Sequence, residues 1–175
     1  KKIVLAFSGG LDTSFCVPYL KEKGYDVYAV TVDTGGFTRG EMNKIKNRAK
    51  ELGVTKHFVI DGKPDLYHQI VSYVIKANVL RGGVYPLCAG PERIIQAAKV
   101  IDIAKQIGAS AVAHGSTGAG NDQVRFDVAI HTLAPTLEIV TPIRELGMSR
   151  SEEVEYLQKH GIPVETSSKD YSVNK

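Results

Sequence analysis

Residues Ile3–Ser14 read IVLAFSGGLDTS, and they join an apolar run to a glycine turn and a helix start. The run Ile3–Phe7 predicts a strand covered on both faces, which is typical of parallel sheets. The adjacent Gly9 and Gly10 let the backbone approach a ligand closely. Amide groups at the start of the next helix favour anions, and serine and threonine hydroxyls surround them. The segment therefore predicts a loop that holds a polyphosphate.

This loop differs from two common nucleotide-binding motifs. It lacks the lysine of G-x-x-x-x-G-K-[ST], and it lacks the spacing of G-x-G-x-x-G. Its S-G-G-x-D-[ST] pattern instead resembles the loop of the ATP pyrophosphatases, in which the departing pyrophosphate is held. The plain alternative is a glycine turn with a serine or threonine cap.

Strand and helix patterns alternate along the rest of the chain. This order predicts an α/β fold with a doubly wound, mostly parallel sheet and helices on both faces. Pro18 is expected to kink or break the first helix. The predicted strands are Ile3–Phe7, Asp26–Asp33, Lys56–Ile60, Ala109–His114 and Glu138–Thr141. The predicted helices are Leu11–Lys23, Gly40–Leu52, Asp65–Leu80, Pro91–Ile107 and one from the capping box at Ser149 to about His160, with an irregular stretch over Arg81–Gly90.

The composition favours one ordinary domain with small-molecule ligands. Of 175 residues, 43% are hydrophobic, which is enough for a core. The net charge of +3 is mild and its basic residues are scattered, so no nucleic-acid or anionic membrane partner is expected. Two cysteines make no disulfide framework, and Cys16 is expected to be buried. No apolar run approaches the ~20 residues of a membrane helix, so we expect a cytoplasmic protein.

The segment Ala113–Phe126, AHGSTGAGNDQVRF, forms a second polar loop. Three glycines in six residues allow close approach to a ligand. Three polar residues follow. Asn121 offers an amide that both donates and accepts, Asp122 can accept from an ammonium group, and the guanidinium of Arg125 can bind a carboxylate through two hydrogen bonds. This set suits a zwitterionic amino acid. A solvated loop that leads into a surface helix fits the spacing equally well.

Ligands of doubly wound sheets bind at the carboxyl ends of strands, near a reversal of strand order. Three places in this sequence meet that rule: the loop after the first strand, the residues after Val32, and the loop after His114. We therefore expect these three segments to lie together at one edge of the sheet.

At these residues the chain resembles the N-terminal half of argininosuccinate synthase. The matching motifs are Ala6–Ser14, Tyr85-Pro86-Leu87 and Ala113–Phe126, whose G-N-D-Q-V-R-F run is close to diagnostic. The family joins citrulline to aspartate with ATP and Mg²⁺, through a citrullyl-AMP and pyrophosphate. No catalytic side chain is implied, since the enzyme acts by positioning its substrates and stabilising phosphate charge.

The resemblance implies a role for each matching residue, with Asp12 as the best candidate near Mg²⁺. The implied ATP-binding residues are Ala6, Phe7, Ser8, Gly9, Gly10, Leu11, Asp12, Thr13, Ser14, Val32, His114 and Gly115. The implied citrulline-binding residues are Tyr85, Asn121, Arg125 and Ser172, and those for aspartate are Thr117, Asn121 and Asp122.

The sequence departs from the family pattern at several positions that bear on the amino-acid substrate rather than on ATP. Gly90 stands where the family has a hydroxyl, and Ala119 stands where it has a lysine. Alternatives are therefore an ATP-binding relative with another amino-acid or ureido substrate, a tRNA-thiolating ligase, and a non-catalytic adenine-nucleotide-binding module.

The resemblance also implies a domain organisation. Residues 1–165 would form the nucleotide-binding domain, and 166–175 would begin the connection to a C-terminal synthetase domain. The family protein is a tetramer, so a homo-oligomer is expected of the full protein. The stretch up to Lys175 alone is expected to bind ATP with weak or absent synthase activity.

Overall fold

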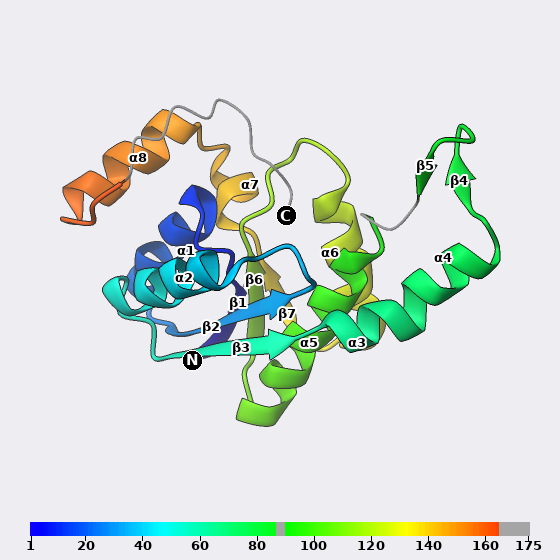
Figure 1. Ribbon diagram of the computed structural model, residues 1–175. Coiled ribbons are helices and arrows are strands. Elements are labelled where there is room, and N and C mark those ends of the chain that lie inside the picture. The colour runs from blue at the N-terminus through cyan, green and yellow to red at the C-terminus, as the bar shows by residue number, and fades with distance from the viewer. Residues whose placement is uncertain (87–89, 165–175) are drawn as a thin grey trace.

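The computed structural model describes residues 1–86 and 90–164. Within them, one sheet has the order β3-β2-β1-β6-β7, and its neighbouring strands all run parallel (Figure 1). The order reverses at β1, which pairs with both β2 and β6, so the predicted doubly wound α/β sheet is confirmed. The strands are β1 Lys2–Ala6, β2 Asp26–Asp33, β3 Lys56–Asp61, β6 Ala111–His114 and β7 Glu138–Val140.

Helices cover both faces of the sheet because successive residues of each buried strand point to opposite sides. Ile3 and Leu5 of β1 pack with α1, α2 and α7 in one core cluster, while Val4 packs with α5 and α6 in the other. Helix α8 lies against α1 on the first face. The helices are α1 Leu11–Glu22, α2 Arg39–Glu51, α5 Glu92–Ile107, α6 Asp122–Leu133, α7 Pro142–Leu146 and α8 Arg150–Lys159.

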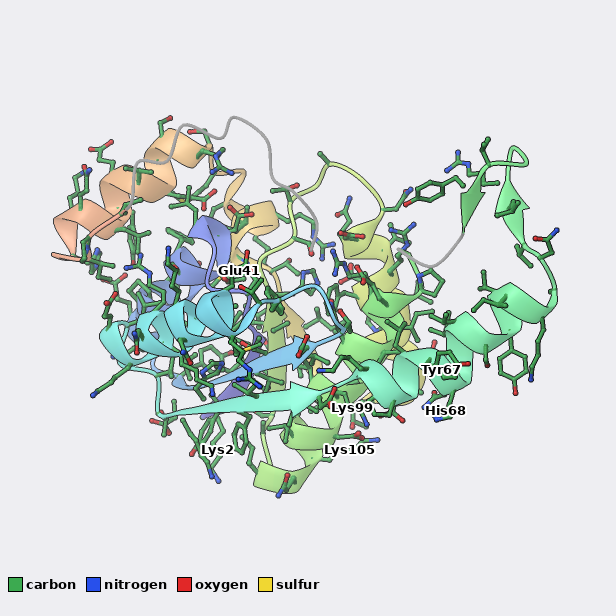
Figure 2. All side chains as sticks on the ribbon, in the orientation of Figure 1. Lys2, Glu41, Tyr67, His68, Lys99 and Lys105 are labelled. Carbon is green, nitrogen blue, oxygen red and sulfur yellow. The ribbon has the colours of Figure 1, made fainter. Side chains whose placement is uncertain are left out.

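A projecting arm follows β3 and extends away from the sheet (Figure 1). Helix α3 (Lys63–Leu66), the π-helix η1 (Tyr67–Val71) and helix α4 (Ser72–Lys76) follow one another, and the hairpin β4 (Leu80–Arg81) with β5 (Tyr85–Pro86) comes next. An ion pair of 2.5 Å between Lys99 Nζ of α5 and Asp65 Oδ2 fixes the base of this arm (Figure 2).

The structure corrects several expectations about element bounds. Helix α1 does not end early at Pro18, which is buried inside it, because packing against the sheet outweighs the lost backbone bond. The helix expected over Asp65–Leu80 ends at Lys76, and Asn78 then adopts a left-handed conformation with φ of 48°. The second polar loop leads into a helix, α6, as one of the two expectations for that stretch had it, and α7 was not predicted.

Other expectations hold. Cys16 is fully buried. Both ends of α8 agree with the prediction within one residue, because Ser149 and Glu152 form the expected capping box. In the described part of the chain, no helix combines the length and apolar character needed to cross a bilayer.

Candidate functional site

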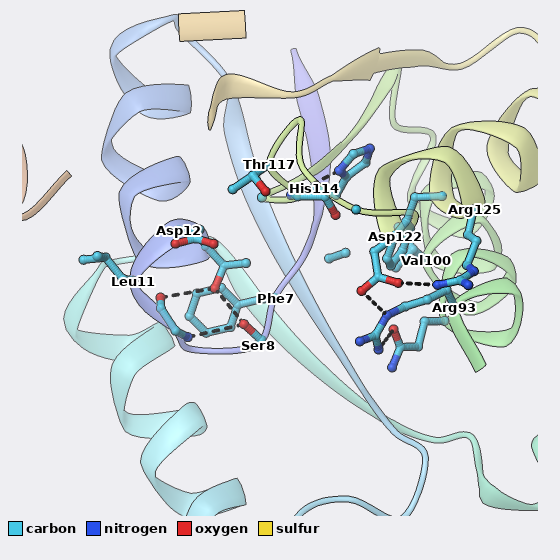
Figure 3. A pocket seen from close by; sticks show the side chains of 18 of the residues that line it. Phe7, Ser8, Leu11, Asp12, Arg93, Val100, His114, Thr117, Asp122 and Arg125 are labelled. Carbon is cyan, nitrogen blue, oxygen red and sulfur yellow. Dashed lines mark hydrogen bonds and ion pairs between the residues drawn. The ribbon is translucent and has the colours of Figure 1, made fainter. Parts of the chain in front are cut away.

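One cavity of about 800 Å³ opens at the carboxyl ends of β1, β2 and β6. Its size falls in the ~300–1,000 Å³ range of small-molecule sites. Figure 3 shows Ser8 and Asp12 on one side, and Arg93, Asp122 and Arg125 across the cavity from them. The three segments that the sequence placed at one sheet edge therefore come together here.

Most residues that the sequence singled out line this cavity. Gly9 and Ser14 do not, and Tyr85 lies on β5 in the arm, also away from the cavity. Ser172 lies outside the described residues. The predicted residues that line the cavity are Ala6, Phe7, Ser8, Gly10, Leu11, Asp12, Thr13, Val32, His114, Gly115, Thr117, Asn121, Asp122 and Arg125.

The loop after β1 is shaped by glycine and by short hydroxyl contacts. Gly9 has φ of 75°, and a Cβ atom added there would lie 3.1 Å from Ile45 Cγ1. The Gly10 amide donates to Ser8 Oγ at 3.3 Å, and Ser8 Oγ lies 3.2 Å from Thr13 Oγ1. These bonds fold the loop back onto the first turn of α1, so that helix amides near Leu11 can face an anion.

Ser14 has a structural contact instead of a cavity position. Its side chain is almost fully buried, and its hydroxyl accepts a hydrogen bond of 3.0 Å from Arg48 Nε. Arg48 also donates to the Pro163 carbonyl at 2.8 Å, which ties α1, α2 and the end of the described chain together. Ser14 thus holds the loop's supporting helix in place.

The loop after β6 is held by a buried histidine. The Ser116 amide donates to His114 Nδ1 at 3.3 Å, so the ring proton lies on Nε2, which donates to Asp127 Oδ1 at 2.9 Å. Arg144 Nη1 completes the group at 2.7 Å from Asp127 Oδ2. Burial lowers the pKa of His114, although the Asp127 carboxylate opposes that shift. A neutral His114 therefore positions Gly115 at the cavity wall.

The guanidinium groups of Arg93 and Arg125 both donate hydrogen bonds to Asp122 on the far side of the cavity. Arg93 Nε donates to Oδ2 at 3.2 Å, and Arg125 Nη1 donates to Oδ1 at 2.8 Å. Arg93 is only 8% exposed and also pairs with Glu92 Oε1 at 3.0 Å. A Cβ atom at Gly90 would lie 2.9 Å from Arg125 Nη2, so the missing side chain makes room for this guanidinium. The two arginines are thus paired with the acidic side chains of Asp122 and Glu92 in one ion-pair cluster at the cavity wall.

Sequence reasoning missed three charged residues of the cavity lining: Arg93, Arg150 and Glu153. Glu153 is 1% exposed, and its carboxyl group lies within hydrogen-bonding reach of the Asp12 carboxyl. Burial first, and then the charge of Asp12, raise the pKa of Glu153 to about 8. The sequence did carry a signal for Glu153. This acid stands one helical turn before Leu157, on the face of the predicted helix that should be apolar.

Among the described residues, no three or more His, Cys, Asp or Glu side chains lie together in a way that could hold a metal ion. Two carboxylates, from Asp12 and Glu153, do face the cavity. Mg²⁺ commonly takes one or two carboxylates together with substrate phosphates, so this pair fits an ATP-dependent Mg²⁺ site.

A fold comparison supports the architecture alone. A solved structure described as a predicted subunit of tRNA methyltransferase, from Methanocaldococcus jannaschii, superimposes with a TM-score of 0.56 at 19% sequence identity. The match covers 92% of this chain and 88% of that chain.

Sequence relatives identify the family. The family described as "Arginosuccinate synthase N-terminal HUP domain" matches residues 2–163. The chain is 49% identical over 174 residues to argininosuccinate synthase of Pyrobaculum aerophilum, and 48% identical over 172 residues to that of Methanocaldococcus jannaschii. It covers 99% and 98% of its own length in these matches, and spans 43% of the length of each relative. The chain therefore belongs to the argininosuccinate synthase family, and it corresponds to that family's N-terminal HUP domain.

Proposed function

We propose that this chain is the ATP-binding part of a ligase that adenylates citrulline for condensation with aspartate to argininosuccinate. The supporting observation is that one and the same cavity is lined by the Ser8–Thr13 loop and, across from it, by Asp122 and Arg125 (Figure 3). A polyphosphate cradle and an amino-acid-recognising wall then share one space. The relatives' name, argininosuccinate synthase, names the product of the proposed ligation, and the two amino-acid substrates and a role in arginine biosynthesis are part of the proposal.

The proposed reaction breaks ATP between its α and β phosphates. The ureido oxygen of citrulline attacks the α-phosphate, and pyrophosphate leaves into the loop formed by Ala6, Phe7 and the residues through Thr13. The aspartate amine then attacks the activated carbon, and AMP leaves. Mg²⁺, when bound, would neutralise charge on the phosphates. The chain's own share is to hold and orient both partners and to offer backbone amides to developing negative charge.

The two amino acids would lie on the far wall. Asn121, Arg125, Tyr85 and Ser172 are proposed for citrulline, and Thr117, Asn121 and Asp122 for aspartate. The adenine ring would lie over Val32, with His114 and Gly115 closing on the nucleotide. In the structure Asp122 accepts bonds from two arginines, so an aspartate ammonium group would have to share its carboxylate.

The proposed assembly follows the resemblance to the family. Residues 1–165 would be the nucleotide-binding domain, 166–175 would lead to a synthetase domain, and the full protein would be a cytoplasmic homotetramer. Neither nucleic acid nor a membrane is a proposed partner.

Calorimetric titration of ATP tests the nucleotide site. Ser8→Ala should weaken ATP binding at least tenfold, because it removes a hydroxyl that shapes the loop. Ser110→Ala is the control, since Ser110 is exposed and bonds Lys2 at the opposite end of the sheet. Equal affinity in Ser8→Ala and Ser110→Ala would overturn the loop assignment.

Citrulline-dependent release of pyrophosphate by the full-length protein tests the reaction. Release that requires citrulline, followed by AMP formation that requires aspartate, is the expected result. Release with another ureido or amino-acid substrate but not with citrulline would favour the alternative that the Gly90 position raises. ATP binding without any release would favour a non-catalytic nucleotide-binding module.

A further inference from the structure

Glu153 places a buried carboxyl group at the phosphate end of the cavity. It lies in the first turn of α8, is 1% exposed, and lines the cavity with Asp12. Its carboxyl group is within hydrogen-bonding reach of the Asp12 carboxyl. Among the residues that the structure describes, no hydrogen-bond partner satisfies Glu153 Oε2. A buried acceptor without a donor is rare and requires an explanation.

The helix itself does not explain an acid at this position. Ser149 and Glu152 already form a reciprocal capping box, which satisfies the first backbone donors and supplies negative charge at the helix start. Glu153 instead lies on the buried side of α8 with Leu157, one turn later, which is fully buried. An apolar side chain would fill this place without the cost of burying a carboxylate. Helix capping and packing therefore leave the acid at this position, and its unpaired Oε2, unexplained.

We propose that Glu153 and Asp12 together hold a divalent cation, Mg²⁺ in the working protein, beside the pyrophosphate loop. Hard cations take oxygen ligands, and Mg²⁺ is usually held by one or two carboxylates, with phosphates and waters completing its octahedron. Asp12 lies in the first turn of α1, two residues after Gly10, so the pair borders the space where phosphates would lie. A cation there removes the repulsion between the two carboxylates and gives Glu153 Oε2 a partner.

This inference rests on the proposed ATP site and adds a second metal ligand to it, from a helix far along the chain. The rival explanation is a proton shared between the two carboxyl groups, with no metal. The two explanations differ in what a glutamine at position 153 would do. A glutamine can donate a hydrogen bond to Asp12, but it replaces an anionic ligand with a weak neutral one.

Electron paramagnetic resonance of Mn²⁺ distinguishes the metal site from the shared proton. Mn²⁺ takes the same oxygen ligands as Mg²⁺, and the spectrum measures the concentration of free Mn²⁺ directly. Mn²⁺ is titrated into the chain alone, and again with α,β-methylene-ATP, which cannot release pyrophosphate. We expect Glu153→Gln to weaken Mn²⁺ binding at least tenfold in both titrations. Glu155→Gln, an equal charge change at an exposed position of the same helix, should stay within twofold of the parent.

Equal Mn²⁺ affinity in Glu153→Gln and the parent would overturn the metal site and leave the shared proton. Absence of bound Mn²⁺ in the parent, with and without the analogue, would overturn it too. Analogue binding in chelator-treated buffer is measured in parallel for the parent and for Glu153→Gln. Failure of the parent to bind the analogue counts against the proposed ATP site. Normal analogue binding by both proteins, with the same Mn²⁺ affinity in Glu153→Gln as in the parent, counts against Glu153 as a metal ligand only. Retained analogue binding by the variant shows that its fold is intact.

Discussion

Gly115 lies so close to Thr13 that a Cβ atom at position 115 would sit 3.2 Å from Thr13 Cγ2. The same atom would lie 3.3 Å from Asp12 Cβ and from the Asp12 backbone carbon. The loops after β1 and β6 are therefore in contact, and the spacing between these two walls of the cavity depends on this glycine.

Gly115→Ala is expected to separate these two loops by a few tenths of an ångström. We expect ATP affinity to fall about tenfold, or ~1.4 kcal/mol, in a calorimetric titration. Gly118→Ala is the matched control, because it lies in the same loop and an added Cβ meets nothing within 4 Å. Equal affinities of the two variants would show that the contact does not set the shape of the site.

Gly9→Ala should destabilise the fold through two effects. The φ of 75° strains any other residue by ~1–2 kcal/mol, and the added Cβ also meets Ile45 Cγ1 at 3.1 Å. Gly24→Ala has a similar φ of 82° with nothing within 4 Å, so it carries only the strain. Denaturant unfolding should therefore show a larger loss of free energy of unfolding in Gly9→Ala than in Gly24→Ala. A larger loss in Gly24→Ala would contradict the packing argument.

The pH dependence of stability should reveal Glu153. Its pKa is about 8 in the folded chain, against 4.5 for an ordinary glutamate, so the folded state binds more protons between these pH values. The free energy of unfolding should then fall as pH rises from about 5 to 8, by on the order of 3 kcal/mol for this group. Glu153→Gln should remove that fall and be the more stable protein at pH 8. The measurement is urea unfolding of the parent and of Glu153→Gln in chelator-treated buffer. An equal fall of the free energy of unfolding in both proteins would refute the role of Glu153.

Arg93→Ala should damage both stability and the far wall of the cavity. The Arg93 guanidinium is almost buried between Asp122 and Glu92, and its removal leaves Asp122 with Arg125 alone. We expect a loss of about 2 kcal/mol in the free energy of unfolding. Arg93→Lys should recover less than half of it, because an ammonium group cannot replace the planar fork. Full recovery by lysine would mean that charge alone matters there.

The sequence predicted the sheet because each of its strands shows a local pattern and each intervening helix has its own period. It also predicted that the candidate site lies at the carboxyl ends of the strands, because loops that follow the strands of a doubly wound sheet gather at that edge. Thr13 and Gly115, far apart in the chain, could thus be placed at one cavity.

Other residues depend on tertiary contacts that no local pattern reveals. Glu153 faces Asp12 only because α8 packs on α1, and Ser14 is covered only because Arg48 reaches it from α2. Tyr85 was singled out in an irregular stretch without periodicity, so its position on the arm could not be derived. Its role in binding citrulline stays a prediction.

The central position of β1 has a consequence for how this domain is made. Lys2 donates to the Ile107 carbonyl although the two residues are 105 positions apart, and Ala6 pairs with His114. During synthesis, the strand that carries the phosphate loop thus leaves the ribosome with one of its two neighbours still untranslated. Such long-range pairing is slow to form. The cavity is lined by residues of both strands, so a ligand can find the complete cavity only after β1 and β6 have paired.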